Sequence, residues 1–241
     1  MINAGIDEVS ALVPAAGLGE RLGLGPKAFL MLNGRPLLAW VADKVSRVAR
    51  EVILALPEKH LEEARSLCPN CICISGAATR QDTIAELVRV SNRNILLIQD
   101  LARPFASERL LRDVCLTAKA HGIAGAFYFP GVPVARVSED GWVRDSYPSK
   151  DCTIFQSPQA FRRDLLQSIL ASTAKFHWRS QSTIELAIRA GIPVRVVPGE
   201  VQNLKITTPE DWRLGQSLTG TLNEFWFFRH AISSVAFLLV R

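Results

Sequence analysis

Two glycines and two cationic residues follow the first apolar strand candidate of this 241-residue chain. Residues 14–21 are Pro-Ala-Ala-Gly-Leu-Gly-Glu-Arg, and Lys27 follows shortly after them. Gly17 and Gly19 let the backbone turn tightly and come close to a ligand, and the exposed N–H groups of such a loop form a cradle for anions. Arg21 and Lys27 add positive charge suited to a polyphosphate. The segment therefore favours nucleotide-phosphate binding over an ordinary strand-to-helix turn with solvated basic residues.

Two widespread nucleotide-binding loops do not fit this segment. A Walker A loop ends in Gly-Lys-Ser or Gly-Lys-Thr, and that ending is missing here. The dinucleotide fingerprint needs glycine or alanine at its third position, where this chain has Leu22. The proline before the loop and the arginine after it instead resemble the signature of sugar-nucleotide pyrophosphorylases and related nucleotidyltransferases.

A second candidate segment opens a predicted helix after the strand candidate at residues 71–74. It runs from Gly76 through Arg80 to Thr83 and begins with small residues. Small residues and a helix N-terminus supply backbone groups that bind a phosphate or a base. This segment is therefore a candidate for part of the same ligand site.

Asp100 and Lys205 extend the set of charged candidates. Asp100 follows a strand that looks buried and precedes Arg103. A carboxylate there can hold Mg²⁺, which commonly takes only one or two protein carboxylates plus substrate phosphates; for Asp100 considered alone, a helix or turn cap is the simpler explanation. Lys205 is flanked by Leu204 and Ile206, which predicts a lysine placed in a short strand rather than loose in solvent.

The elements that must position these residues alternate between strand and helix. Strand candidates lie at residues 9–13, 52–56, 71–74, 95–99, 125–129 and 194–197, and helix candidates at residues 36–48, 59–67, 81–90, 108–121, 162–170, 183–190 and 209–218. Residues 157–161 are predicted to form a loop leading into a helix. The alternation predicts an α/β fold with a mostly parallel sheet covered by helices on both faces. Ligands then bind at the carboxyl ends of the strands.

Two segments depart from this alternation. Residues 131–150 contain two short strand patterns around an Asp-Gly turn, which predicts a β-hairpin arm within a nucleotidyltransferase domain at 1–219. A hairpin that cannot bury both faces often packs on a partner subunit, so we expect a homodimer formed through the arm. Residues 220–241 form an apolar tail too short to span a bilayer; an interfacial helix, a dimer contact and a poorly ordered appendage are all open for it.

Composition narrows the class of protein. Apolar residues make up 48% of the chain, enough for a substantial core, and the net charge is +5. The basic residues are scattered and no aromatic-interleaved RNA-binding motif is present, so anionic small substrates, and no nucleic acid, are expected. The five cysteines and the lack of a basic-then-apolar leader predict a cytoplasmic protein. Cys68 and Cys71 have the spacing of a metal or redox pair, but without a second pair we expect structural thiols.

Taken together and in this order, the segments resemble the 2-C-methyl-D-erythritol 4-phosphate cytidylyltransferases of non-mevalonate isoprenoid synthesis. The likeness covers roughly residues 9–218 and rests on Pro-Ala-Ala-Gly-x-Gly-x-Arg, Arg-x-Asp-Thr, Asp-x-Ala-Arg-Pro and Asn-x-Lys-x-Thr elements. The resemblance implies a Rossmann-like nucleotidyltransferase fold, a mostly parallel twisted sheet flanked by helices with a β-hairpin arm. It also implies CTP and a polyol phosphate as substrates, and Mg²⁺ as cofactor.

The resemblance also implies a role for each candidate residue. The loop backbone at Ala15, Ala16 and Gly17 would contact CTP, and Gly76, Arg80 and Thr83 would face its cytosine and ribose. Arg21, Lys27 and Lys205 would neutralise the triphosphate in catalysis. Asp100 would support Mg²⁺, and Arg103 would bind the phosphate of the acceptor.

The acceptor half departs from the family pattern more than the nucleotide half does. In the arm, Arg136 stands where the family has an acid, and Ser149 stands where it has an arginine, with Lys150 adjacent. We therefore predict that Arg136 or Lys150 approaches the acceptor site, across the dimer. Gln99 replaces the histidine before the metal-site aspartate. Two alternatives stay open: another polyol or sugar phosphate such as ribitol 5-phosphate as acceptor, and a nucleotide-binding paralogue with impaired catalysis.

Overall fold

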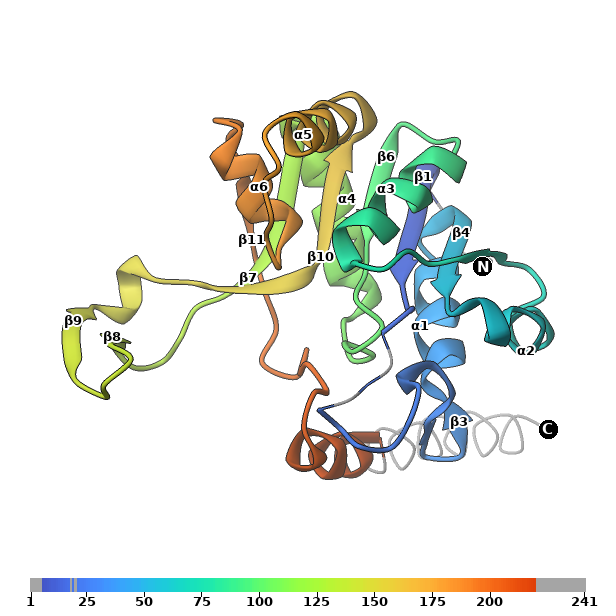
Figure 1. The fold of residues 1–241 in the computed structure, drawn as a ribbon, viewed down its shortest axis with the longest axis horizontal. Helices are drawn as coiled ribbons and strands as arrows, with labels where there is room; N and C mark the ends of the chain where they lie inside the picture. The colour runs from blue at the N-terminus through green and yellow to red at the C-terminus, as the bar shows by residue number, and fades with distance from the viewer. Residues whose placement is uncertain (1–5, 18, 20, 220–241) are drawn as a thin grey trace, which may run out of the picture.

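A seven-stranded sheet forms the centre of the computed structural model, which describes residues 6–17, 19 and 21–219 (Figure 1). The strand order is β11-β7-β10-β6-β1-β4-β5. The bounds are β1 Ile6–Pro14, β4 Ala49–Leu56, β5 Ile72–Ser75, β6 Ile95–Ile98, β7 Ile123–Tyr128, β10 Ile154–Arg162 and β11 Arg195–Pro198. The pairs β1–β4, β1–β6, β4–β5 and β7–β11 are parallel, as the strand and helix alternation predicts. The six strand candidates are all present, with shifted ends.

Helices cover both faces of this sheet. The α-helices are α1 Leu37–Ser46, α2 Leu61–Leu67, α3 Arg80–Val90, α4 Glu108–His121, α5 Arg163–Lys175 and α6 Thr183–Arg189, followed by a helical segment at residues 209–219; the 3₁₀ turns are η1 Lys27–Phe29, η2 Glu58–His60 and η3 Ser149–Asp151. Alternate residues of the central strands enter two cores: Val13, Leu54 and Leu97 pack with α1 and α4, whereas Leu12 and Ile53 pack with α3, α5 and α6. Because both faces are buried, the centres of β1, β4 and β6 are mainly apolar.

Strand β10 corrects one expectation, because residues 157–161 are not a loop. They lie in the sheet between β6 and β7 and pair antiparallel with both. The pattern concealed this strand because Gln156, Ser157 and Gln159 are polar and yet buried. Pro158, which cannot donate a ladder hydrogen bond, falls where the β10–β7 register shifts between Phe155 and Gln159.

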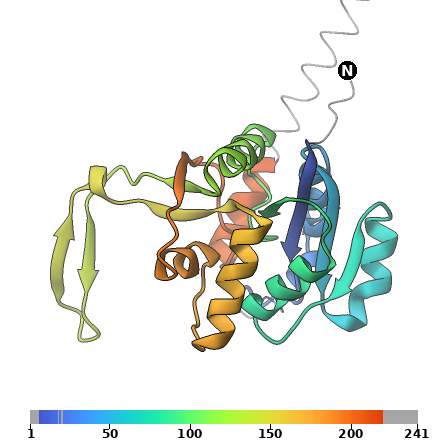
Figure 2. The ribbon, with the colours of Figure 1, turned by 90° about the horizontal axis from the view of Figure 1, so that it is seen from above.

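The predicted hairpin at residues 131–150 is present as a two-stranded sheet of its own. Strands β8 Val134–Val137 and β9 Val143–Tyr147 pair antiparallel, and the arm projects away from the body in both views (Figures 1 and 2). Its side chains include exposed Val132, Trp142 and Val143. A smaller ribbon of β2 Met31–Leu32 and β3 Arg35–Pro36 links the first loop to α1.

The prediction that Lys205 lies in a short strand is wrong. Residues 203–207 are extended chain without sheet pairing, so Lys205 does not lie in a strand. One main-chain hydrogen bond and one buried side chain hold this segment instead. The Ile206 N–H donates to Ala102 O, and the Ile206 side chain is fully buried. Among residues 6–17, 19 and 21–219, no helix is long and apolar enough to cross a membrane. The tail predicted at residues 220–241 lies outside the described residues.

Candidate active site

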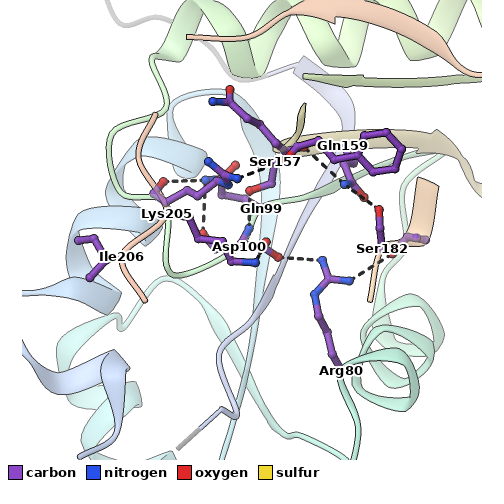
Figure 3. A network of polar contacts seen from close by, with 12 residues as sticks. Arg80, Gln99, Asp100, Ser157, Gln159, Ser182, Lys205 and Ile206 are labelled. Atoms are coloured by element: carbon purple, nitrogen blue, oxygen red, sulfur yellow. Dashed lines mark hydrogen bonds and ion pairs between the residues drawn. The ribbon is translucent and has the colours of Figure 1, made fainter. Parts of the chain in front are cut away.

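Charged side chains from three separate segments meet beyond the carboxyl ends of β1 and β6 (Figure 3). Arg80 Nη2 lies 2.8 Å from Asp100 Oδ1, and Lys205 Nζ lies 3.5 Å from Asp100 Oδ2. Asp100 follows β6, Arg80 opens α3 and Lys205 lies in the unpaired segment before the last helix. Three candidates that are distant in the sequence therefore share one ion-pair cluster.

The Asp100 carboxylate is ionised in this environment. Burial alone raises its pKa, but the charges of Arg80 and Lys205, with the hydrogen bond from Arg80, outweigh burial and lower the pKa to about 2. Its backbone N–H donates to Ser157 Oγ at 3.1 Å, so β10 fixes the start of the Asp100 turn. A permanently negative oxygen pair at a strand end is chemically suited to a divalent cation or to the cations it already contacts.

Lys27 brings further positive charge to this cluster. Its Nζ donates to Ile206 O at 2.8 Å, which links the first loop to the Lys205 segment. Burial lowers the pKa of Lys27, and the nearby charges of Arg21 and Lys205 lower it further. The three catalytic candidates, Arg21, Lys27 and Lys205, are thus close enough to influence one another electrostatically. Such crowding of like charges is stabilised when an anion lies between them.

The first loop is joined to the sheet through the backbone of Ala15. The Ala15 N–H donates to Ala55 O at 2.8 Å and continues the β1–β4 ladder, so this group is not free for a ligand. Within the described residues, the N–H groups of Ala16 and Gly17 have no protein partner. Gly19 has a φ of +74°, and a Cβ there would lie 2.6 Å from Gly25 O, so the turn requires glycine.

A pocket of about 200 Å³ lies between this loop and the N-terminus of α3. Its walls are Pro14, Ala16, Gly17, Ala77, Ala78, Thr79, Arg80 and Thr83. The volume is smaller than a typical enclosing ligand site, so the pocket suits one end of an extended ligand. Gly76 lies behind it: a Cβ at Gly76 would come within 2.4 Å of Ala16 Cβ, so small residues let the two loops touch.

Thr83 lines the pocket from a buried position. The side chain is buried, and Oγ1 accepts from the Ala77 N–H at 3.0 Å and donates to Thr79 O at 2.8 Å. These contacts shape the loop ahead of α3, whose own start is capped by Thr79 Oγ1 accepting from the Asp82 N–H. Thr83 is placed to organise the pocket wall.

Arg103 is buried and makes its hydrogen bonds within the protein. The residue is 8% exposed, and its Nη1 and Nη2 donate to Asn203 O at 2.5 Å and Phe155 O at 3.2 Å. Burial lowers its pKa, although the Asp100 charge opposes this. The guanidinium therefore points into the protein and ties β10 to the Lys205 segment. This geometry favours a positioning role over direct contact with an acceptor phosphate.

A buried amide network behind the cluster was not predicted from the sequence. Asn203 Nδ2 donates to Ser157 O at 2.7 Å and to Gln156 Oε1 at 3.2 Å, and Gln156 Nε2 donates to Glu200 O at 3.0 Å. Asn203 is fully buried. The only signal for it was the match of Asn203 to the Asn-x-Lys-x-Thr element. The network explains how a segment without sheet pairing holds Lys205 in place.

Residues near Arg80 were likewise missed as candidates. Arg80 Nη1 lies 3.5 Å from Thr183 Oγ1 at the start of α6, and Gln159 Nε2 lies 3.5 Å from Ser182 Oγ (Figure 3). Ser182 and Thr183 are polar, so a helix cap would have been their ordinary interpretation. Together with Ser157 they give the face of the cluster nearest β10 several hydroxyl groups.

The arm candidates lie apart from this cluster within one chain. Arg136 belongs to β8, is exposed, and its Nε donates to Asp145 Oδ2 on β9 at 2.6 Å. Lys150 lies in η3 and is exposed. Both are carried by the arm, which extends away from the sheet (Figures 1 and 2). The structure therefore does not bring Arg136 to the acceptor site of its own chain.

Known proteins with similar sequences belong to the family that the sequence motifs resemble. The family model of 2-C-methyl-D-erythritol 4-phosphate cytidylyltransferase matches residues 9–220. The enzyme of that name from Deinococcus radiodurans is 34% identical over 220 residues, covering 90% of this chain and 92% of the relative. The one from Thermus thermophilus is 36% identical over 217 residues, covering 88% and 97%.

Solved structures agree with the fold. The crystal structure of the Thermus thermophilus enzyme has a TM-score of 0.75 and 32% identity, covering 88% of this chain and 98% of the other. A 4-diphosphocytidyl-2C-methyl-D-erythritol synthase from Anaerococcus prevotii has a TM-score of 0.79 at 23% identity, covering 89% and 96%, which supports the fold alone. On the extent of the family match and the identity to these relatives, the chain belongs to the 2-C-methyl-D-erythritol 4-phosphate cytidylyltransferase family.

Proposed function

We propose that this chain transfers the cytidylyl group of CTP to 2-C-methyl-D-erythritol 4-phosphate and releases pyrophosphate, a step in the synthesis of isoprenoid precursors. Membership of the family carries the proposal. The retained cluster of Lys27, Asp100 and Lys205 supports turnover over simple nucleotide binding, because binding alone does not need three charged groups from separate segments.

In this proposal CTP bridges the pocket and the cation cluster. The cytidine end lies against Ala16, Gly17 and the N-terminus of α3, where unpartnered backbone N–H groups of the described loop are available. The triphosphate extends toward Arg21, Lys27 and Lys205. The crowded positive charges that lower the pKa of Lys27 are then compensated by phosphate oxygens.

The chemistry follows from this placement. The acceptor phosphate attacks the α-phosphorus in line, the bond to the β-phosphate oxygen breaks, and pyrophosphate leaves with the electron pair. Negative charge builds on the oxygens around the α-phosphorus, where Lys27 and Lys205 stabilise it. Positioning and electrostatics are sufficient, so no nucleophilic side chain is required.

Asp100 is the residue that would hold Mg²⁺. Its carboxylate is ionised, and Mg²⁺ binds through one or two carboxylates together with substrate phosphates. No group of three or more His, Cys, Asp or Glu side chains among the described residues could hold a metal by itself, which fits a cation that arrives with CTP. The metal would supply charge neutralisation on the triphosphate, and Arg80 would hold the Asp100 carboxylate in place.

The arm supports a homodimer in the proposed assembly. Its exposed apolar residues have no core within the described part of one chain, and a partner would bury them. A partner's arm is also the route by which Arg136 or Lys150 would reach an acceptor phosphate. We further propose a cytoplasmic location, which is supported by five free cysteines with no disulfide among them.

The test is pyrophosphate release by the purified full chain. We expect faster release with CTP than with ATP or GTP, and faster release with 2-C-methyl-D-erythritol 4-phosphate than with ribitol 5-phosphate as the acceptor. Asp100→Asn should raise the Mg²⁺ concentration needed for half-maximal rate, whereas Asp113→Asn on α4, whose carboxylate pairs with exposed Arg109, should not. Release with ribitol 5-phosphate but not with 2-C-methyl-D-erythritol 4-phosphate would show that ribitol 5-phosphate is the acceptor. No release with any acceptor, despite CTP binding in calorimetry, would support an impaired paralogue.

A further inference from the structure

Two cysteines lie in the turn between α2 and β5. Strand β5 is at one edge of the sheet, and β4 separates it from β1 and β6, the strands that precede the candidate active site. Cys68 is the C-cap residue that follows α2, and Cys71 immediately precedes β5. The Cys71 N–H donates to Cys68 O at 3.0 Å, and each of the two thiols shifts the pKa of the other. The Cys-Pro-Asn-Cys segment is therefore folded into a tight turn that brings both cysteines to one pocket.

A solvent-open pocket of about 200 Å³ gives access to both cysteines. Its far wall is Arg35 and α1, and Asn70 lies on the turn itself. Cys68 is only 6% exposed, so the pocket is the path by which a small molecule reaches its sulfur. None of the residues in this pocket belongs to the proposed cytidylyltransferase site.

The surroundings favour a thiolate on Cys68. The hydrogen bond from Cys71 lowers the pKa of Cys68, and the Arg35 charge lowers it further, whereas burial opposes both. The same hydrogen bond, together with burial, raises the pKa of Cys71. One sulfur is thus disposed to be the nucleophile and its neighbour to remain a protonated thiol, the division of roles found in exchange-active Cys-x-x-Cys pairs.

We propose that Cys68 and Cys71 are a reversible modification site that exchanges with low-molecular-weight disulfides. The Cys68 thiolate attacks one sulfur of the small disulfide and releases one thiolate, leaving a mixed disulfide on Cys68. Cys71 loses its proton to solvent, attacks the Cys68 sulfur and releases the second thiolate. The protein loses two protons and two electrons, and the small disulfide is reduced to two thiols.

The other cysteines provide internal controls. Cys115 is 1% exposed, and burial raises its pKa to about 12, so it is inert. Cys73 lies on β5, and burial raises its pKa as well. The sequence singled out the spacing of Cys68 and Cys71 but favoured structural thiols for the pair, and only the folded turn shows both cysteines at one pocket.

The test uses the full chain and glutathione disulfide, with intact mass and peptide mapping as readouts. We expect the mass to fall by two hydrogen atoms, a Cys68–Cys71 link in the peptides, and full reversal by dithiothreitol. Cys71→Ser should instead accumulate one glutathione on Cys68, and Cys73→Ser should behave like the parent chain. Arg35→Gln should slow the exchange by about threefold, because the pKa of Cys68 rises and the higher nucleophilicity offsets only part of the lost thiolate. Arg35→Lys should restore the rate.

Two results would overturn the proposal. One is a chain that stays reduced in excess glutathione disulfide while unfolded chain reacts normally. The other is preferential glutathionylation of Cys73 or Cys152 with Cys68 unmodified. Both readouts are independent of cytidylyl transfer, so failure here leaves the proposed function untouched.

Discussion

Asp100 is the residue at which the charges of the candidate site converge. Arg80 and Lys205 contact its two oxygens, and Lys27 reaches the same region through Ile206 O. Among the described residues, the cations Arg21, Lys27, Arg80 and Lys205 outnumber the carboxylates Asp100 and Asp211 that act on them, so the site has surplus positive charge. Such a surplus is suited to the developing negative charge of a phosphoryl transfer.

Removal of Lys205 should slow turnover more than it weakens binding. We expect Lys205→Ala to lower kcat by about 10²–10³, the typical loss for one donor aimed at transition-state charge. Steady-state pyrophosphate release at saturating CTP measures this effect. Lys175→Ala, which removes an exposed lysine at the end of α5, is the matched control and should leave kcat unchanged. If Lys205→Ala turns over like the control, Lys205 has no catalytic role.

The depressed pKa of Asp100 predicts a stability change at acid pH. A fall from 3.8 in the unfolded chain to about 2 in the folded protein stabilises the fold by roughly 2 kcal/mol above about pH 4. That contribution is lost as the pH falls through about 2, because both states then bind the proton. Urea unfolding between about pH 5 and 2 should show a steeper decline for the parent chain than for Asp100→Asn. Parallel pH profiles for the two proteins would contradict the assigned ion pairs.

Arg103 should contribute to stability. Arg103→Gln removes donors from two main-chain oxygens, and leaving such groups unpaired costs about 1–3 kcal/mol each. We expect a lower Tm and a kcat loss through the displaced Lys205 segment, with the KM for the acceptor little changed. Arg213→Gln, which breaks only an exposed ion pair, is the control. A normal Tm with a raised acceptor KM would instead support the phosphate contact predicted from the sequence.

At the scale of elements, the site depends on two loops that contact each other. The loop after β1 and the loop after β5 touch at Ala16 and Gly76, with the pocket opening beside them. Both loops start with a hydrogen bond back to the sheet, from Ala15 N–H to Ala55 O and from Gly76 N–H to Leu56 O. The sheet thus sets their separation, and only small side chains fit between them.

Gly76→Ala tests this arrangement directly. The added Cβ would lie 2.4 Å from Ala16 Cβ, far inside van der Waals contact, so the loops must separate. We expect the KM for CTP to rise by about tenfold, equivalent to roughly 1.4 kcal/mol of lost binding, with the fold retained by circular dichroism. Gly131→Ala, at a glycine with open space around it, is the control. An unchanged KM would mean that the loop contact does not shape the nucleotide site.

At the scale of the whole molecule, the arm is the feature that one chain does not explain. Val132, Trp142 and Val143 are each more than 60% exposed, and none of the three belongs to either core of the described residues. A two-stranded hairpin is at best marginally stable alone. Packing against a second copy of the chain would bury these side chains. It would also bring Arg136 and Lys150 of the arm toward the site of the partner subunit.

The oligomeric state should therefore depend on the arm. Sedimentation equilibrium should show a dimer for the parent chain and a monomer for the double variant Val132→Glu, Trp142→Glu. Leu116→Glu, an equally drastic change at an exposed position on α4, should remain dimeric. A parent chain that sediments as a monomer would remove the cross-subunit role of Arg136.

Local patterns were sufficient for much of this protein. The alternation of apolar strands and amphipathic helices predicted the parallel sheet, and the glycines at 17 and 19 predicted the loop, because both features depend on residues close in the sequence. The arm was visible in the same way, from an Asp-Gly turn between two short strand patterns. Arg21, Lys27 and Asp100 became candidates because they follow strands, and their roles stay predictions.

Tertiary structure alone decided which of these residues meet and which way they point. Arg103 has the same position in sequence whether it faces a substrate or two buried carbonyls, and only packing turns it inward. Strand β10 is stabilised by neighbours on both sides and by the Gln156 and Asn203 amides, so its polar residues hide it from any local pattern. Long-range contacts also bring Lys205 to Asp100 without a strand, because buried hydrogen bonds hold its segment. Sequence periodicity carries no information about such contacts, which form between residues far apart in the chain.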